Sequence, residues 1–177
     1  MPKKHSELLR YLESLAPDEI AAEIKELYRL FPAVREYYQV KIYGDGEAMA
    51  FNKYKRVVKN EFFPERGLGK IRLSVARRAV SDFLKISRIP FYQAEIMLYF
   101  VETGVKFTNA YGDIYEPFYN SMGSMYEKAA RFVTAHGLER PFQERFHAIV
   151  RDTSHIGWGF HDELSHMYQQ YFLKKVK

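Results

Sequence analysis

Cysteine is absent from this chain of 177 residues, and tryptophan occurs once. The absence of cysteine excludes disulfide bonds, thiolate nucleophiles and metal sites with cysteine ligands. Long apolar runs are lacking as well. The most apolar stretch, residues 89–101, is interrupted by Gln93 and Glu95 and is too short to span a bilayer. These absences favour a cytoplasmic protein with no membrane-embedded part.

Apolar and aromatic residues are plentiful. Hydrophobic residues make up 47% of the chain and charged residues 28%, which is ordinary for a globular protein. The length suits a single domain over residues 1–177. Aromatic residues reach 16%, and we interpret them as core packing rather than as the lining of a ligand pocket.

Apolar residues recur at helical spacing along most of the chain. Four of them share one face of an expected amphipathic helix: Ile20, Ile24, Leu27 and Phe31. Pro17 suits the first position of that helix, and Pro90, Pro117 and Pro141 each suit the first turn of a further one. No convincing strand and no repeat period appears. The sequence therefore predicts an all-α fold, an irregular bundle of about eight or nine helices.

Three local signals add detail to this expectation. Residues 43–46 form the clearest turn signal in the chain. Ser74 is expected to cap a helix that follows a loop over residues 63–70. Asp113 and Glu116 have the spacing of a capping box, which explains this pair of acids better than general acid–base chemistry does.

Positive charge is concentrated in the basic segment, residues 53–88. This segment holds eleven Lys or Arg and three acids, which suggests an acidic protein or a nucleic acid as partner. The expected contacts are five cations: Arg66, Lys70, Arg72, Arg77 and Arg78. The loop around Gly67 and Gly69 resembles a phosphate cradle only weakly, because it is not a P-loop. Alternatively, the segment is a solvated face in which Arg78 pairs with Asp82.

The second candidate region is a polar cluster near the C-terminal end. It contains the only tryptophan, flanked by glycines in a Gly-Trp-Gly corner, residues 157–159, and it could draw on the two acids before the helix at Pro117. The candidate residues are Asp113, Glu116, Asp152, His155, Trp158, His161, Asp162 and His166.

Four of these residues could form a metal site: Asp152, His155, Asp162 and His166. Asp162 and His166 have the spacing of two ligands on one helix face, but His161 and His166 do not. The His161–Asp162 doublet resembles helical metal-dependent phosphohydrolases, although no later Asp follows it. The competing interpretation is a structural corner in which Trp158 fills the core and the glycines adopt positive φ. His161 or Asp162 then supports the start of the next helix.

Three segments together resemble a family of bacterial domains of unknown function: residues 61–83, 108–120 and 152–164. The likeness spans nearly the whole chain. It implies a bacterial, cytoplasmic origin and supports an all-helical domain, but it implies no activity, cofactor or catalytic residue.

Together these patterns favour a non-enzymatic binding or regulatory module for an anionic or protein partner, without a cofactor. The basic segment would provide its contacts. Two alternatives stay open: a metal-assisted hydrolase that uses the C-terminal cluster, and a self-associating structural protein whose first partner is another copy of the chain.

Overall fold

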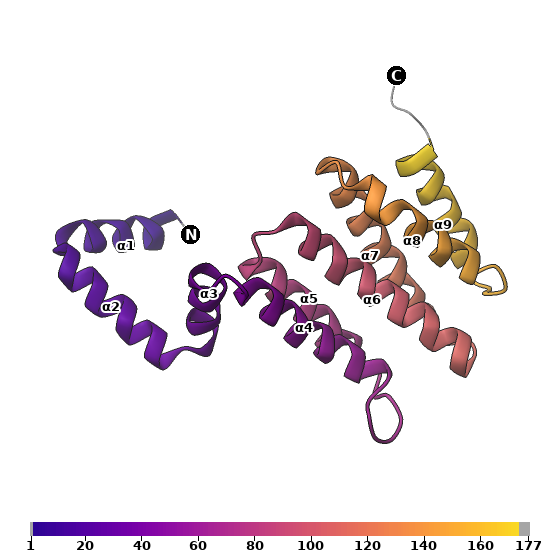
Figure 1. Cartoon of the computed structure of the whole chain (residues 1–177), viewed down its shortest axis with the longest axis horizontal. Helices are drawn as coiled ribbons and strands as arrows, with labels where there is room; N and C mark the ends of the chain where they lie inside the picture. Colours follow the sequence, from indigo (N-terminus) through magenta and orange to yellow (C-terminus); the bar gives the residue numbers. More distant parts are fainter. Residues whose placement is uncertain (1, 174–177) are drawn as a thin grey trace. The chain divides into compact units, whose positions relative to one another are not determined.

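The computed structural model describes residues 2–173. Within this range the chain forms nine α-helices, a short π-helix and no strand (Figure 1). The all-α fold and the number of helices are therefore confirmed. The chain divides into two compact units, residues 1–46 and residues 47–177. That both units belong to one domain stays a prediction.

Unit 1 contains the helices α1 (Pro2–Ser14), α2 (Pro17–Leu30) and α3 (Pro32–Ile42). Helices α2 and α3 each begin at a proline, and the start at Pro17 was expected. Ala16 precedes α2 and offers no capping side chain. Instead the Ala16 N–H donates to the Glu19 carboxylate at 2.7 Å, which satisfies a backbone donor at the start of the helix.

Unit 1 leaves much of its apolar surface exposed. No residue of α2 is buried, although its predicted apolar stripe is present in the sequence. The large exposed apolar side chains of α1, α2 and the residue after α2 are Leu8, Leu9, Tyr11, Ile24, Leu27, Leu30 and Phe31. Exposed apolar faces of this kind are often covered by another protein surface. The expected self-association stays a prediction.

Unit 2 holds the remaining helices. They are α4 (Gly46–Phe62), α5 (Leu73–Ile86), α6 (Pro90–Tyr111), α7 (Glu116–Ala135), α8 (Glu139–Asp152), α9 (Phe160–Tyr168) and the π-helix η1 (Gln169–Leu173). The three expected prolines lie at the first position or in the first turn of α6, α7 and α8. Helix α6 is the central element: half of its residues are buried, and it contacts α5, α7 and α8 (Figure 1).

Aromatic rings fill the core of unit 2. Phe62 of α4 contacts Phe100 and Phe107 of α6 and Phe118 of α7, with ring centroids 6.0 to 6.4 Å apart. All four rings are almost completely buried. Ring pairs at this separation add to the free energy gained from area burial. The interpretation of the aromatic residues as core packing therefore agrees with the structure.

Two expected helix caps are wrong. Helix α5 begins at Leu73, with Arg72 at the cap position, so Ser74 lies inside its first turn. Helix α7 has Tyr115 at its cap position and no capping side chain. Asp113 instead accepts a hydrogen bond from the Tyr119 hydroxyl at 2.7 Å. The local pattern assigned Asp113 to a helix cap, but its side chain is hydrogen-bonded to Tyr119, a residue of the neighbouring helix α7.

The expected position of Trp158 is also wrong. Its side chain is 64% exposed, whereas Phe160 is 1% exposed and packs against the Tyr119 ring at 5.0 Å. Trp158 and Gly159 have φ values of 63° and 68°. Gly157, for which positive φ was also expected, is outside this region. The expected positive φ is therefore confirmed at Gly159, whereas Trp158 rather than Gly157 is the second such residue, and Phe160 rather than the indole packs in the core.

Candidate functional site

A groove between α5 and α7 gathers cationic side chains that lie far apart in the sequence. Its volume is about 580 Å³. Its charged and hydroxyl-bearing lining residues are Arg77, Arg78, Ser81, Asp82, Lys85, Ser124 and Lys128. Four cationic side chains and one carboxylate thus line the groove, so its net charge is positive and it should attract anions.

Helical periodicity explains why these side chains share a surface. Helix α5 buries the face formed by Ala76, Ala79, Val80 and Phe83. The opposite face carries the two arginines, Ser81 and Lys85 toward solvent. On α7, Ser124 and Lys128 are four residues apart and therefore lie on one face. Each helix contributes one polar wall of the groove.

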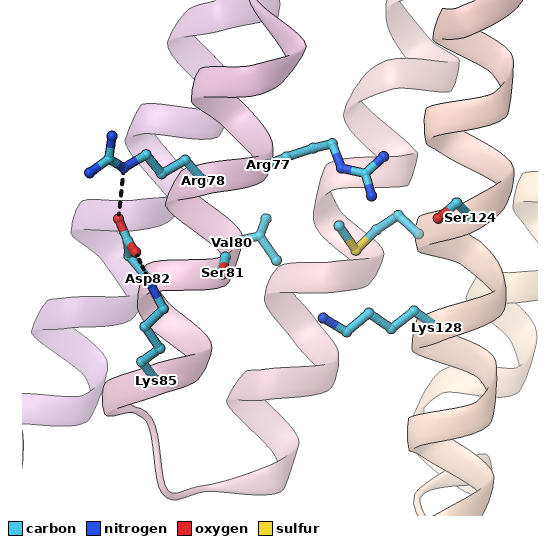
Figure 2. A pocket seen from close by; sticks show the side chains of 9 residues that line it. Arg77, Arg78, Val80, Ser81, Asp82, Lys85, Ser124 and Lys128 are labelled. Atoms are coloured by element: carbon cyan, nitrogen blue, oxygen red, sulfur yellow. Dashed lines mark hydrogen bonds and ion pairs between the residues drawn. The ribbon is translucent and has the colours of Figure 1, made fainter. Parts of the chain in front are cut away.

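Arg77 and Lys128 extend toward each other from the opposite walls (Figure 2). The Arg77 guanidinium donates through Nη1 to Ser121 Oγ of α7 at 3.1 Å, which restricts its orientation. Over residues 2–173, neither Arg77 nor Lys128 has a carboxylate within 4.0 Å. Two uncompensated cations therefore face one space.

The other two cations of the groove are paired within α5. Arg78 Nε lies 3.6 Å from one oxygen of Asp82, as expected from the sequence, and Lys85 Nζ lies 2.7 Å from the other oxygen (Figure 2). The hydrogen bond from Lys85 lowers the pKa of Asp82, and the charge of Arg78 adds to this effect. Asp82 therefore offsets part of the charge at this edge, and the free positive charge is greatest at Arg77 and Lys128.

The structure does not bring the five expected cations together. Arg77 and Arg78 line the groove, whereas Arg66 and Lys70 lie in the loop between α4 and α5 and do not. The Arg72 side chain is bound to the Glu61 carboxylate at 2.7 and 3.0 Å. Arg72 therefore closes that loop.

Sequence reasoning missed Lys128 altogether. It lies 40 residues after the end of the basic segment, in a part of the chain where acids outnumber cations. Only its spacing from Ser124 on an amphipathic helix distinguishes it locally, and many surface lysines share that feature. Its role depends on the packing of α7 beside α6 and α5.

The C-terminal cluster separates into different environments. His161 Nδ1 lies 3.1 Å from the Val150 carbonyl oxygen and 3.2 Å from Thr153 Oγ1, so its ring braces the start of α9 against the end of α8. Asp152 lies beside Arg151, at 3.5 Å. No group of three or more His, Asp and Glu side chains among residues 2–173 could hold a metal ion. The geometry gives no support to the site expected from Asp152, His155, Asp162 and His166.

Two residues from separate parts of the predicted cluster do converge. Asp113 and His155 line the same pocket, of about 230 Å³, together with Thr108 and Asn109. Glu116, Trp158, Asp162 and His166 do not line it. This pocket joins the end of α6 to the loop between α8 and α9.

Comparison with known proteins gives a family but no function. No curated protein and no solved structure matches the chain. No helix in the described range is long and apolar enough to cross a membrane. Residues 1–172 match the model of a family of unknown function (DUF6155). The chain belongs to this family, as the resemblance of its three segments implied.

Proposed function

We propose that the protein is a non-enzymatic binding module that captures an acidic segment of a partner protein in the groove between α5 and α7. The observation that carries the proposal is the pair Arg77 and Lys128, which face one groove without a carboxylate partner among the described residues. Bringing two such cations close to each other is unfavourable unless an anion or solvent compensates them. A ligand carboxylate would receive a charge-assisted hydrogen bond from each side chain.

The groove also offers neutral donors. Ser81 and Ser124 contribute hydroxyl groups to its walls, and hydroxyl groups can donate to carboxylate oxygens. Arg77 is restrained by Ser121, so less side-chain entropy is lost when it binds an anion. These features suit a ligand with one or two carboxylates.

An acidic polypeptide is favoured over a nucleic acid because the cations do not line one extended path. Arg66 and Lys70 do not line the groove, and Arg72 is bound to Glu61. Lys55 lies over the rings of Phe51 and Tyr99, at 5.3 and 4.5 Å from their centroids. Non-specific nucleic-acid binding usually requires many phosphate contacts, and two free cations in one groove provide few.

The test measures binding of poly-L-glutamate and of a single-stranded oligonucleotide to four proteins. These are the wild type, the double variant R77Q/K128Q, and two controls: the double variant R10Q/R140Q, with the same change in net charge, and R66Q/K70Q in the loop. We expect R77Q/K128Q to weaken poly-L-glutamate binding at least about tenfold, since each charged hydrogen bond contributes about 1.5–3 kcal/mol. The controls should change it little.

Three results would reject the proposal. One is the absence of poly-L-glutamate binding by the wild type. Another is equal weakening in R77Q/K128Q and R10Q/R140Q, which would indicate a general charge effect. The third is tighter binding of the oligonucleotide with a steep dependence on salt that R66Q/K70Q flattens, which would favour a nucleic-acid partner.

We also propose that the protein is bacterial and acts in the cytoplasm. The resemblance of the three segments supports the first statement, and the cysteine-free composition supports the second. Fractionation of cells that express the protein tests its location.

A further inference from the structure

We propose that the pocket formed by Asp113, His155 and Asn109 is a second binding site, which takes a protonated amino group. This site is separate from the cationic groove and has the opposite preference for charge. It does not depend on the function proposed for the groove.

Two connections between helices form the pocket. Thr108 and Asn109 belong to the last turns of α6, and Gly112 and Asp113 follow them; His155 and Ile156 come from the loop between α8 and α9. The Asn109 side chain donates to the carbonyl oxygen of Asp152 at 2.9 Å, which joins the two sides. The volume of about 230 Å³ suits a group the size of an amino-acid side chain.

Asp113 is held in position by a buried hydroxyl. Tyr119 is 2% exposed, and its hydroxyl donates to Asp113 Oδ1 at 2.7 Å. The same hydroxyl oxygen accepts a hydrogen bond from the Ile114 N–H at 3.2 Å and lies 2.9 Å from Thr108 Oγ1. Asp113 Oδ2 makes no hydrogen bond to the described residues, and no Lys or Arg among them pairs with this carboxylate. The carboxylate is thus oriented but lacks a cation.

The neighbouring polar groups are mostly acceptors. The Asn109 side-chain nitrogen donates to the Asp152 carbonyl oxygen, so the side-chain oxygen of Asn109 can accept from a ligand. The His155 ring makes no hydrogen bond to residues 2–173, and a neutral imidazole offers one acceptor nitrogen. An alkylammonium group has three donors and one positive charge, so it matches a carboxylate, an imidazole and an amide oxygen. The negative charge of Asp113 would instead repel a carboxylate or phosphate ligand.

The test measures binding by isothermal titration calorimetry with the full chain. The probes are putrescine, Nα-acetyl-lysine amide and, as an uncharged control, 1-butanol. Asp113→Asn removes the charge but keeps an oxygen that can accept from Tyr119. Glu116→Gln is the matched control, because it loses the same charge three residues away and does not line the pocket.

We expect both amines to bind the wild type and Glu116→Gln, and 1-butanol to bind neither. Asp113→Asn should weaken amine binding at least about tenfold, as expected for the loss of a charged hydrogen bond. His155→Ala should weaken it less. Tighter binding of the lysine derivative than of putrescine would identify a peptide side chain as the ligand, and tighter binding of putrescine would identify a free amine.

Two outcomes would overturn the proposal. One is the absence of amine binding by the wild type. The other is unchanged binding by Asp113→Asn, with a melting temperature close to that of the wild type. Neither outcome bears on the groove, because poly-L-glutamate binding is measured separately.

Discussion

Glu47 shows how one buried carboxylate joins distant parts of unit 2. It is 7% exposed and lies in the first turn of α4. Its carboxylate accepts hydrogen bonds from the Ser87 hydroxyl and from the backbone N–H groups of Arg88 and Ile89. These donors belong to the connection between α5 and α6, so Glu47 fixes the start of α6 against α4.

Replacing Glu47 should therefore destabilise the protein. Glu47→Ala leaves several donors without an acceptor, and we expect the free energy of unfolding to fall by about 2–3 kcal/mol. Urea unfolding followed by circular dichroism measures the change. The control Glu13→Ala removes an exposed carboxylate of α1 and should change the free energy by less than about 0.5 kcal/mol. Equal losses in both variants would contradict this account.

Trp158 and Phe160 provide a second comparison between neighbouring residues. Because the indole is exposed and Phe160 is buried, Trp158→Ala should change the free energy of unfolding by less than about 0.5 kcal/mol. Phe160→Ala removes a core ring and should cost about 3–5 kcal/mol. Thermal unfolding of the two variants measures both effects. A large loss in Trp158→Ala would show that the indole is buried in solution.

The position of Trp158 could not be predicted from its neighbours. A lone tryptophan between two glycines is typical of a buried ring at a tight turn, and both glycines allow positive φ. Which residues adopt it depends on the approach of α8 to α9. The sequence holds no signal that Trp158, rather than Gly157, shares this conformation with Gly159, or that Phe160, rather than the indole, packs against Tyr119.

At the scale of elements, the connection between α4 and α5 is closed by one ion pair. Glu61 is 5% exposed, and Arg72 binds it through its side chain and through its backbone N–H at 3.2 Å. The Ile71 N–H also donates to the Glu61 carbonyl oxygen at 2.9 Å. The loop of residues 63–71 therefore has a fixed base.

The ion pair between Arg72 and Glu61 predicts that the free energy of unfolding depends on pH. Hydrogen bonds from Arg72 lower the pKa of Glu61 from its ordinary value of 4.5, although burial opposes them. Because the pKa is lower in the folded protein than in the unfolded chain, the stabilisation is present above 4.5 and is lost as the pH falls through the folded-state pKa. The difference in unfolding free energy between the wild type and Arg72→Gln should therefore shrink as the solution is acidified.

Urea unfolding at several pH values from about 7 to about 3 measures this difference. Arg77→Gln is the control, because Arg77 has no carboxylate partner among residues 2–173, and its difference from the wild type should not shrink in the same range. A difference for Arg72→Gln that grows on acidification would contradict the ion pair.

Element boundaries were easier to predict than the contacts of polar residues near them. Four prolines correctly indicated helix starts, because proline at the first turn loses no hydrogen bond. Ser74 and Asp113 were assigned to caps on local spacing alone. Arg72 binds Glu61 and stands at the cap position of α5 in place of Ser74. Asp113 accepts a hydrogen bond from Tyr119 instead of capping α7. Such tertiary partners are distant in sequence and leave no local pattern.

At the scale of the whole molecule, the all-α fold could be predicted because helical periodicity is a local property that recurs throughout the chain. The groove could be predicted only on one side. Arg77 and Arg78 stand in a basic segment, but Lys128 reaches them through the packing of α7. The pocket at Asp113 and His155 likewise joins residues about 40 positions apart. Spatial sites of this kind require the fold.

The distribution of buried residues yields the last prediction. Nearly all buried apolar side chains of the described range belong to unit 2, and Val40 is the exception. A unit of 46 residues without a core of its own is close to the size below which chains rarely fold unaided, about 40 residues.

We therefore expect a fragment of residues 47–177 to unfold cooperatively, within about 5 °C of the full chain, a shift equivalent to roughly 1 kcal/mol. A fragment of residues 1–46 should show no cooperative transition, because isolated helices of this length are marginal in water. Thermal unfolding by circular dichroism distinguishes the two. Loss of cooperativity in the larger fragment would mean that unit 1 covers apolar surface that unit 2 needs, and the two units would then form one domain.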